Sequence, residues 1–135
     1  MDCLFCKIIK GEISAHKVYE DDNVLCFLDI YPHAKGHTVV IPKKHYENFL
    51  DMPDSEMGHF WQVVKKVTGL LKDKLKADGF NVGLNGGEMA GQAVPHLHVH
   101  IFPRFEGDGG GSFHSVIKNP GEEKLEDILK EIIQK

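Results

Sequence analysis

The chain has no long hydrophobic run. Its 135 residues contain no apolar stretch approaching the ~18 residues that cross a membrane, and the N-terminus lacks the basic and then apolar pattern of a signal peptide. An excess of positive charge is also lacking, since 20 acidic residues outnumber 16 Lys and Arg and the net charge is −4. Nothing therefore indicates the basic face that nucleic-acid binding requires. We therefore predict a cytoplasmic protein without a membrane or nucleic-acid partner.

Cysteine is scarce as well. Three cysteines, an odd number in a chain without a secretion signal, indicate reduced thiols rather than a disulfide framework. Cys3 and Cys6 have the spacing of a metal-binding pair, but a tetrahedral zinc site needs two further ligands. Free buried thiols therefore remain an alternative for this pair. Cys26 lies in an apolar segment and is expected in the core.

The most informative segment is residues 96–102, His-Leu-His-Val-His-Ile-Phe. Alternation of histidines with large apolar residues is the pattern of a strand with one buried face. We expect His96, His98 and His100 to project together from the other face. Imidazole can act as a base, a nucleophile or a metal ligand near neutral pH. The pattern thus predicts either a set of metal ligands or a nucleophilic histidine with helpers.

A glycine-rich segment precedes this strand. Residues 85–95 contain three glycines and follow an alternating segment at residues 80–84, so two neighbouring antiparallel strands are predicted. Backbone N–H groups in such a loop can form an anion-binding concavity, and Asn85 and Gln92 add neutral hydrogen-bond donors. Next to three histidines, the loop is a candidate phosphate-binding segment.

Residues 91–102 resemble the signature of the histidine-triad (HIT) nucleotide hydrolases and transferases, in particular the prokaryotic Hint-like branch. Further similarity lies in residues 2–9, 27–30 and 35–45, in the order and at the spacing of that family. These segments together cover most of residues 2–105. The tail beyond Phe105 is less characteristic.

The resemblance implies an enzyme that acts on the α-phosphate of purine nucleotide conjugates such as adenosine 5′-phosphoramidate, through a nucleotidyl-histidine intermediate. His98 would be the nucleophile, attacking through Nε2 while a backbone carbonyl holds the proton on Nδ1. His100 would contact the phosphate oxygens. The implied nucleotide-binding residues are Phe27 and Ile30 beside the base, Asp29 at the ribose hydroxyls, and Asn85, Gly91, Gln92, Ala93, His98 and His100 around the ribose and phosphate. His37 also recurs in the family and is interpreted as structural support.

Ala93 departs from the pattern of the resemblance. The eukaryotic phosphoramidase and diadenosine-polyphosphate branches usually have Ser or Thr at this position, where the hydroxyl is thought to help protonate the leaving group. Alanine has no proton to donate. Adenosine phosphoramidate, aminoacyl adenylate and dinucleoside polyphosphate therefore all remain possible substrates, and a non-catalytic nucleotide-binding protein is a further alternative.

The resemblance also implies a structural zinc. His45 and His96 lie where many prokaryotic members have the two ligands that would complete a site with Cys3 and Cys6. Such a Cys2His2 site would attach the N-terminus to the sheet and would leave His96 outside catalysis. A catalytic metal on the three histidines is a third hypothesis, but a nucleophilic mechanism requires no catalytic metal.

Periodicity predicts an α+β fold. Strands are expected near residues 24–29, 37–41, 80–84 and 96–102, one long helix at residues 57–75, and a short C-terminal helix capped by Asn119. We expect one domain over residues 1–135, with a core at 2–105, a helical extension at 106–135, and an antiparallel sheet of about five strands. The resemblance adds a homodimer whose sheets join edge to edge.

Overall fold

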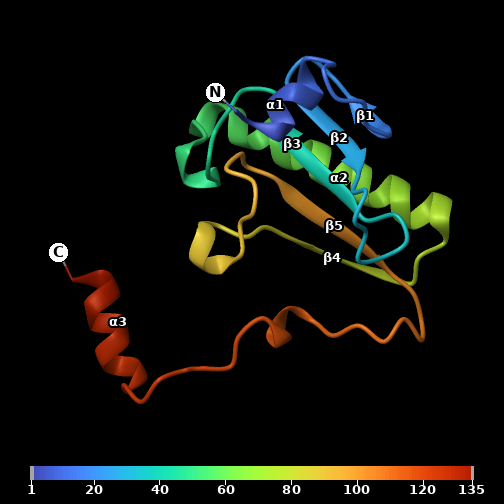
Figure 1. Cartoon of the computed structure of the whole chain (residues 1–135). Coiled ribbons are helices and arrows are strands. Elements are labelled where there is room, and N and C mark those ends of the chain that lie inside the picture. The colour runs from blue at the N-terminus through green and yellow to red at the C-terminus, as the bar shows by residue number, and fades with distance from the viewer. Residues whose placement is uncertain (1, 135) are drawn as a thin grey trace.

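The computed structural model describes residues 2–134 and consists of one antiparallel sheet with a long helix on one face (Figure 1). The strands are β1 (Lys17–Glu20), β2 (Val24–Leu28), β3 (Thr38–Pro42), β4 (Gly79–Gly83) and β5 (Val99–Arg104), and the α-helices are α1 (Leu4–Ile9), α2 (Asp54–Leu75) and α3 (Leu125–Ile133). The sheet order is β1-β2-β3-β5-β4, and every neighbouring pair is antiparallel. This confirms the predicted α+β class.

The sheet buries both of its faces because side chains alternate along each strand. One face packs against α2, and its core includes Val24, Cys26, Val40, Val99 and Ile101. The opposite face packs against α1, and its core includes Phe5, Leu25, Phe27, Val39 and Ile41. Cys26 is fully buried, as predicted. The N-terminal segment is thus held against the side of the sheet that lies away from α2.

Helix α2 follows the predicted apolar stripe. Its buried residues recur at steps of three and four: Phe60, Val63, Val64, Val67 and Leu71. The helix ends where Lys76 adopts a left-handed conformation, with φ of 57°. The helix begins at Asp54, earlier than the apolar stripe predicts. Its first turn carries the acidic residues Asp54 and Glu56, which do not contribute to the stripe but favour a helix N-terminus.

The C-terminal region extends away from the sheet (Figure 1). The predicted cap at Asn119 is wrong, because α3 begins at Leu125 with Lys124 as its N-cap. Gly121, with φ of 77°, lies between the two positions in a conformation that a helix does not contain. No helix among residues 2–134 is long and apolar enough to cross a membrane.

Candidate active site and metal centre

The three histidines project from one side of the chain, as predicted. Pairing of β5 begins only at Val99, so His96 and His98 precede the ladder. The alternation nevertheless holds, because Leu97, Val99 and Ile101 are at most 2% exposed on the α2 side. The ring centroids of His98 and His100 lie 5.0 Å apart. The two side chains can therefore act on one group.

The environment of His98 favours a neutral ring with a free Nε2. Its Nδ1 lies 2.7 Å from the carbonyl oxygen of His96, so Nδ1–H donates and the lone pair is on Nε2. The edge of the Phe5 ring covers the imidazole at a centroid distance of 5.1 Å. Burial is the main cause that lowers the pKa of His98 below its ordinary value. A neutral imidazole with a free Nε2 is competent as a nucleophile.

The ring of His100 contacts a second histidine, His37, which immediately precedes β3. Nε2 of His37 lies 2.9 Å from Nδ1 of His100, and His37 is only 2% exposed. An Oδ2 atom of Asp29 lies 3.6 Å from the same Nε2 of His37. Burial, followed by the neighbouring His98 and His37, lowers the pKa of His100 to about 4. The sequence alone assigns no chemical role to His37, because its partner His100 lies 63 residues away and only the folded sheet brings them together.

A cavity of about 630 Å³ lies beside these residues. Asp29, His37, Asn85 and His100 line it together with residues of the tail, including Phe113. A volume of this size is within the range of small-molecule sites. Of the residues that the resemblance assigns to ribose and phosphate, the cavity lining thus includes Asp29, Asn85 and His100, but not Gly91, Gln92, Ala93 or His98. The C-terminal tail adds a wall that the sequence did not predict.

The glycine-rich loop is shaped by Gln92. Its Oε1 accepts the Gly87 N–H at 2.8 Å, and its Nε2 donates to the carbonyls of Glu47 at 2.6 Å and Val94 at 3.1 Å. Both amide hydrogens are therefore engaged within the protein. Gly91 has φ of 99°, which favours glycine, and a Cβ there would lie 3.6 Å from Nδ2 of Asn85. Gln92 thus holds the loop in the shape that places Gly91 against Asn85.

The remaining predicted nucleotide-binding residues differ in exposure. Phe27 is 5% exposed and packs against Phe5 at 5.6 Å, so much of its surface belongs to the core. Ile30 is 71% exposed and is free to meet a ligand. Asp29 accepts the Tyr31 N–H through Oδ1 at 2.8 Å. Ala93 is exposed in the loop before the histidines.

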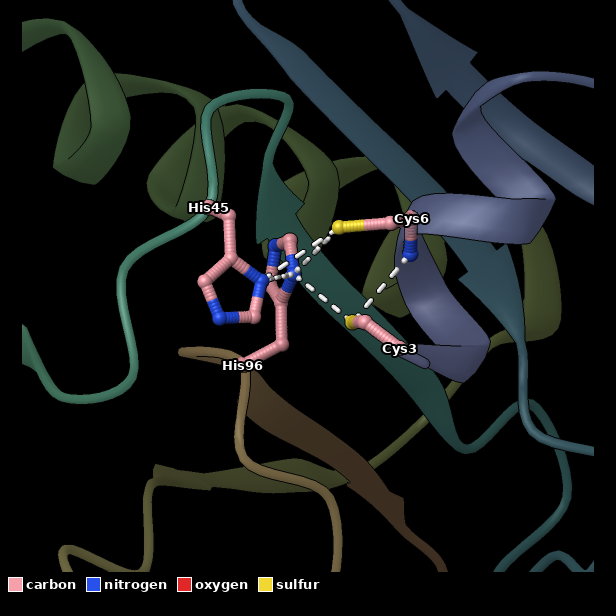
Figure 2. A group of neighbouring side chains, drawn as sticks. All are labelled: Cys3, Cys6, His45 and His96. Atoms are coloured by element: carbon pink, nitrogen blue, oxygen red, sulfur yellow. Dashed lines mark hydrogen bonds between the residues drawn. The ribbon is translucent and has the colours of Figure 1, made fainter. Parts of the chain in front are cut away.

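Cys3, Cys6, His45 and His96 converge as the resemblance implies (Figure 2). His96 Nδ1 lies 3.3 Å from the Cys3 sulfur and 3.6 Å from the Cys6 sulfur, and 3.1 Å from His45 Nδ1. The four ligand atoms all lie within 4.8 Å of one another. His96 Nε2 is 2.9 Å from the carbonyl of Pro42, so it carries the proton and leaves Nδ1 free. Two thiols and two imidazoles with such a supporting bond fit a tetrahedral zinc site.

Asp29, His37 and His100 form a second group of ligand-type atoms within 4.8 Å. His37 Nδ1 accepts the backbone N–H of His33 at 3.1 Å, so the proton of a neutral His37 must lie on Nε2. A protonated Nε2 cannot bind a metal. His96, in turn, directs its free nitrogen to the cysteines. The tautomer of His37 therefore argues against a metal held by Asp29, His37 and His100. The orientation of His96 argues against a metal shared by His96, His98 and His100.

Comparison with known proteins identifies the family. The model of the HIT domain matches residues 10–107. The chain belongs to the HIT family. It is 55% identical over 130 residues to an uncharacterized HIT-like protein of Methanocaldococcus jannaschii, covering 96% of this chain and 98% of that protein. A solved HIT family structure from Bacillus subtilis superposes with a TM-score of 0.84 at 43% identity, covering 98% and 95% of the two chains.

Two further HIT relatives have named activities. An adenosine 5′-monophosphoramidase of Candida albicans is 42% identical over 106 residues, covering 76% of this chain and 70% of that protein. An adenylylsulfatase of Arabidopsis thaliana is 42% identical over 107 residues, covering 79% of this chain and 54% of that protein. Hydrolysis of nucleotide conjugates is thus an activity present among the relatives of this chain.

Proposed function

We propose that this HIT protein hydrolyses purine nucleotide conjugates at the α-phosphate, with adenosine 5′-phosphoramidate as the model substrate. The observation that carries this proposal is the orientation of His98. Its Nδ1 proton is held by the His96 carbonyl at 2.7 Å, and burial keeps the ring neutral by lowering its pKa. The nucleophilic Nε2 then belongs to a ring that lies 5.0 Å, between centroids, from His100, which lines the cavity.

The reaction proceeds in two displacements. Nε2 of His98 forms a bond to the α-phosphorus while the bond to the leaving group breaks, which gives a nucleotidyl-histidine. A water oxygen then bonds to the same phosphorus, the Nε2–P bond breaks and one proton of that water passes to solvent, which releases the nucleoside monophosphate and restores neutral His98. His100 donates a hydrogen bond to a non-bridging oxygen, where charge develops. Asp29 accepts from the ribose, as its position on the cavity wall allows.

Ala93 limits which leaving groups depart easily. An amine must gain a proton as the P–N bond breaks, and with alanine at this position the proton comes from water. Sulfate departs as a stable anion without a proton, so an adenylyl sulfate is a second candidate, in line with the activity named for the Arabidopsis relative. A dinucleoside polyphosphate, whose leaving group is also an anion, is the third.

The test is AMP release from adenosine 5′-phosphoramidate, adenylyl sulfate and a diadenosine polyphosphate, each measured as kcat/KM. The proposal expects turnover of the phosphoramidate by the unmodified chain. A marked preference for either anhydride substrate would assign the chain to that activity instead, with the absence of a hydroxyl at Ala93 as its reason.

His98→Asn separates catalysis from binding. We expect it to abolish turnover, with a loss of the order of 10⁴-fold or more, as when a nucleophile is removed from a catalytic unit. AMP binding by calorimetry should persist. His114→Asn, in the exposed tail, is the matched control and should retain activity. Turnover that survives in His98→Asn contradicts the assignment, and binding without turnover in the unmodified chain supports the non-catalytic alternative.

We also propose a structural zinc held by Cys3, Cys6, His45 and His96. The convergence of the four ligand atoms and the protonated Nε2 of His96 support it. When bound, the metal would join the N-terminal segment to the segment that leads into the triad. It would contribute stability, and the reaction at His98 would not involve it.

A further inference from the structure

A chain of hydrogen bonds connects the backbone to His100. The N–H of His33 donates to Nδ1 of His37 at 3.1 Å. On the other side of the His37 ring, Nε2 lies 2.9 Å from Nδ1 of His100. Both distances are within the normal hydrogen-bond range. The family assignment does not explain why a buried histidine occupies position 37, whereas this chain of contacts gives it a defined partner on each side.

The first link fixes the tautomer of His37. A backbone N–H is only a donor, so Nδ1 of His37 must be the acceptor and cannot carry a proton. Since burial also lowers the pKa of His37, the ring is neutral and its single proton is on Nε2. The Oδ2 atom of Asp29, 3.6 Å from Nε2, is too far for a strong hydrogen bond, but its charge favours a proton at that position.

The second link transfers this constraint to His100. Because Nε2–H of His37 points at Nδ1 of His100, that nitrogen must accept, and the proton of His100 is placed on its own Nε2. The tautomer of His100 is therefore opposite to that of His98, whose proton is on Nδ1. One ring then presents a lone pair and the other an N–H.

We infer that His37 is a positioning residue that makes His100 a hydrogen-bond donor toward the substrate phosphate. A neutral His100 in the other tautomer would present a lone pair to an anionic oxygen and would repel it. The inference rests on the proposed function for the identity of the substrate, but the tautomers themselves do not depend on it. A purely packing role for His37 is the competing explanation, since the residue is buried between His33, His100 and Phe102.

Nitrogen NMR of the 15N-labelled full chain tests the tautomers directly. Two-bond correlations between ring protons and ring nitrogens distinguish Nδ1–H from Nε2–H in each neutral histidine. We expect Nε2–H for His37 and His100 and Nδ1–H for His98 near pH 7.5. A His100 that carries its proton on Nδ1, or exchanges between both forms, overturns the inference whatever the activity of the protein.

Two substitutions separate donation from packing. His37→Phe fills a similar volume but has no donor, whereas His37→Gln has a side-chain N–H that reaches a position near the original Nε2. In His37→Phe we expect a mixture of His100 tautomers and a kcat lower by about 10-fold or more, bounded by the ~10² to 10³-fold loss of one oxyanion donor. In His37→Gln, kcat and the single tautomer of His100 should be largely retained.

The outcomes are distinguishable from a failure of the proposed function. If the unmodified chain releases no AMP from any substrate, the function fails, and the NMR readout with AMP added still decides the tautomer of His100. If His37→Phe does not fold, the comparison of His37→Gln with the unmodified chain remains. Equal loss of kcat in both variants, with the tautomer of His100 unchanged, shows that His37 acts by packing alone.

Discussion

His98 and His100 lie two residues apart on the same side of the chain and yet meet opposite hydrogen-bond partners. A carbonyl oxygen faces Nδ1 of His98, whereas the ring of His37 faces Nδ1 of His100. Identical side chains thus acquire different roles from what lies behind each ring. At this scale, the residues that do not touch the substrate decide the chemistry of those that do.

The buried histidines predict how activity depends on pH. Burial lowers the pKa of His100 from 6.5 to about 4 and lowers the pKa of His98 as well. As the pH falls through 6.5, an ordinary histidine takes up a proton, whereas both of these rings stay neutral to lower pH in the free enzyme. We expect the acidic limb of the kcat/KM profile to lie below pH 6.5, because the pKa of each ring is lowered by burial. A limb at or above pH 6.5 would show that the essential histidines are solvated.

The same shifts give the sign of the stability change. Between pH 6.5 and about 4, the unfolded chain binds protons at position 100 that the folded chain does not bind. Folding stability therefore falls as the pH decreases through this window. Urea denaturation at several pH values would measure this change in the free energy of unfolding. Its dependence on pH should be weaker in His100→Asn, which has no titrating ring at position 100.

Much of the candidate site followed from the sequence because it is local. The alternation at residues 96–102 placed His98 and His100 on one side, and the carbonyl that orients His98 belongs to His96, two residues earlier. His37 and Gln92 could not be assigned in this way. Their partners lie 63 and 45 residues away, so only the packed sheet and loop bring them together.

Among the elements, those with a strong hydrophobic period were predicted and the short ones were not. The alternation around β4 and the apolar runs of β2 and β3 predicted these three strands, and the apolar stripe of α2 predicted the long helix. Helix α1 has six residues and β1 has four, too few for a period to be evident. Both are stabilised by tertiary contacts, α1 through Phe5 and Ile8 and β1 through its pairing with β2.

The turn before β3 is sensitive to an added methyl group. Gly36 has φ of 83°, and a Cβ there would collide with Cδ1 of Leu75 and approach Cγ of Pro103 to 3.3 Å. Gly36→Ala should lower the free energy of unfolding by the left-handed penalty of about 1–2 kcal/mol plus an overpacking term of about 1–3 kcal/mol. Gly11→Ala is the control, since Gly11 has φ of 80° with open space around it. Equal losses in urea denaturation would contradict the collision.

The proposed zinc site, which would join α1 to the segment before β5, predicts that metal removal lowers the stability of the chain. If Cys3, Cys6, His45 and His96 hold zinc, the purified chain should contain one zinc per chain, and Cys3→Ser should contain much less. The bound ion should add about 2.7 kcal/mol to the free energy of unfolding at a free zinc concentration 100-fold above Kd. Elemental analysis and thermal denaturation with and without a chelator measure both quantities. Cys26→Ala is the control, and stoichiometric zinc in Cys3→Ser would contradict the site.

At the scale of the whole molecule, both edges of the sheet, β1 and β4, and the apolar face of α3 have no partner among the described residues. Strand β4 is at the edge of the sheet, with Phe80 51% exposed, and an unpaired edge is a surface for strand addition. Helix α3 exposes Leu125, Leu129 and Ile132 by 81%, 53% and 73%. A helix of nine residues is marginal in water without packing. The homodimer that the HIT resemblance implies stays a prediction, and the β4 edge and the apolar face of α3 are the surfaces at which we expect a second copy to bind.

A homodimer of this kind predicts that the apolar face of α3 contributes to association. Burial of one leucine side chain is worth about 1.5–3 kcal/mol. Because a homodimer loses this burial in both chains, Leu129→Gln should raise the dimer Kd by roughly 10²- to 10⁴-fold. Lys130→Gln, the next residue on the exposed polar side of the same helix, introduces the same side chain and should leave the Kd near that of the unmodified chain. Sedimentation velocity over a concentration series measures all three. A monomeric unmodified chain would contradict the dimer, and equal Kd values for both variants would show that α3 lies outside the interface.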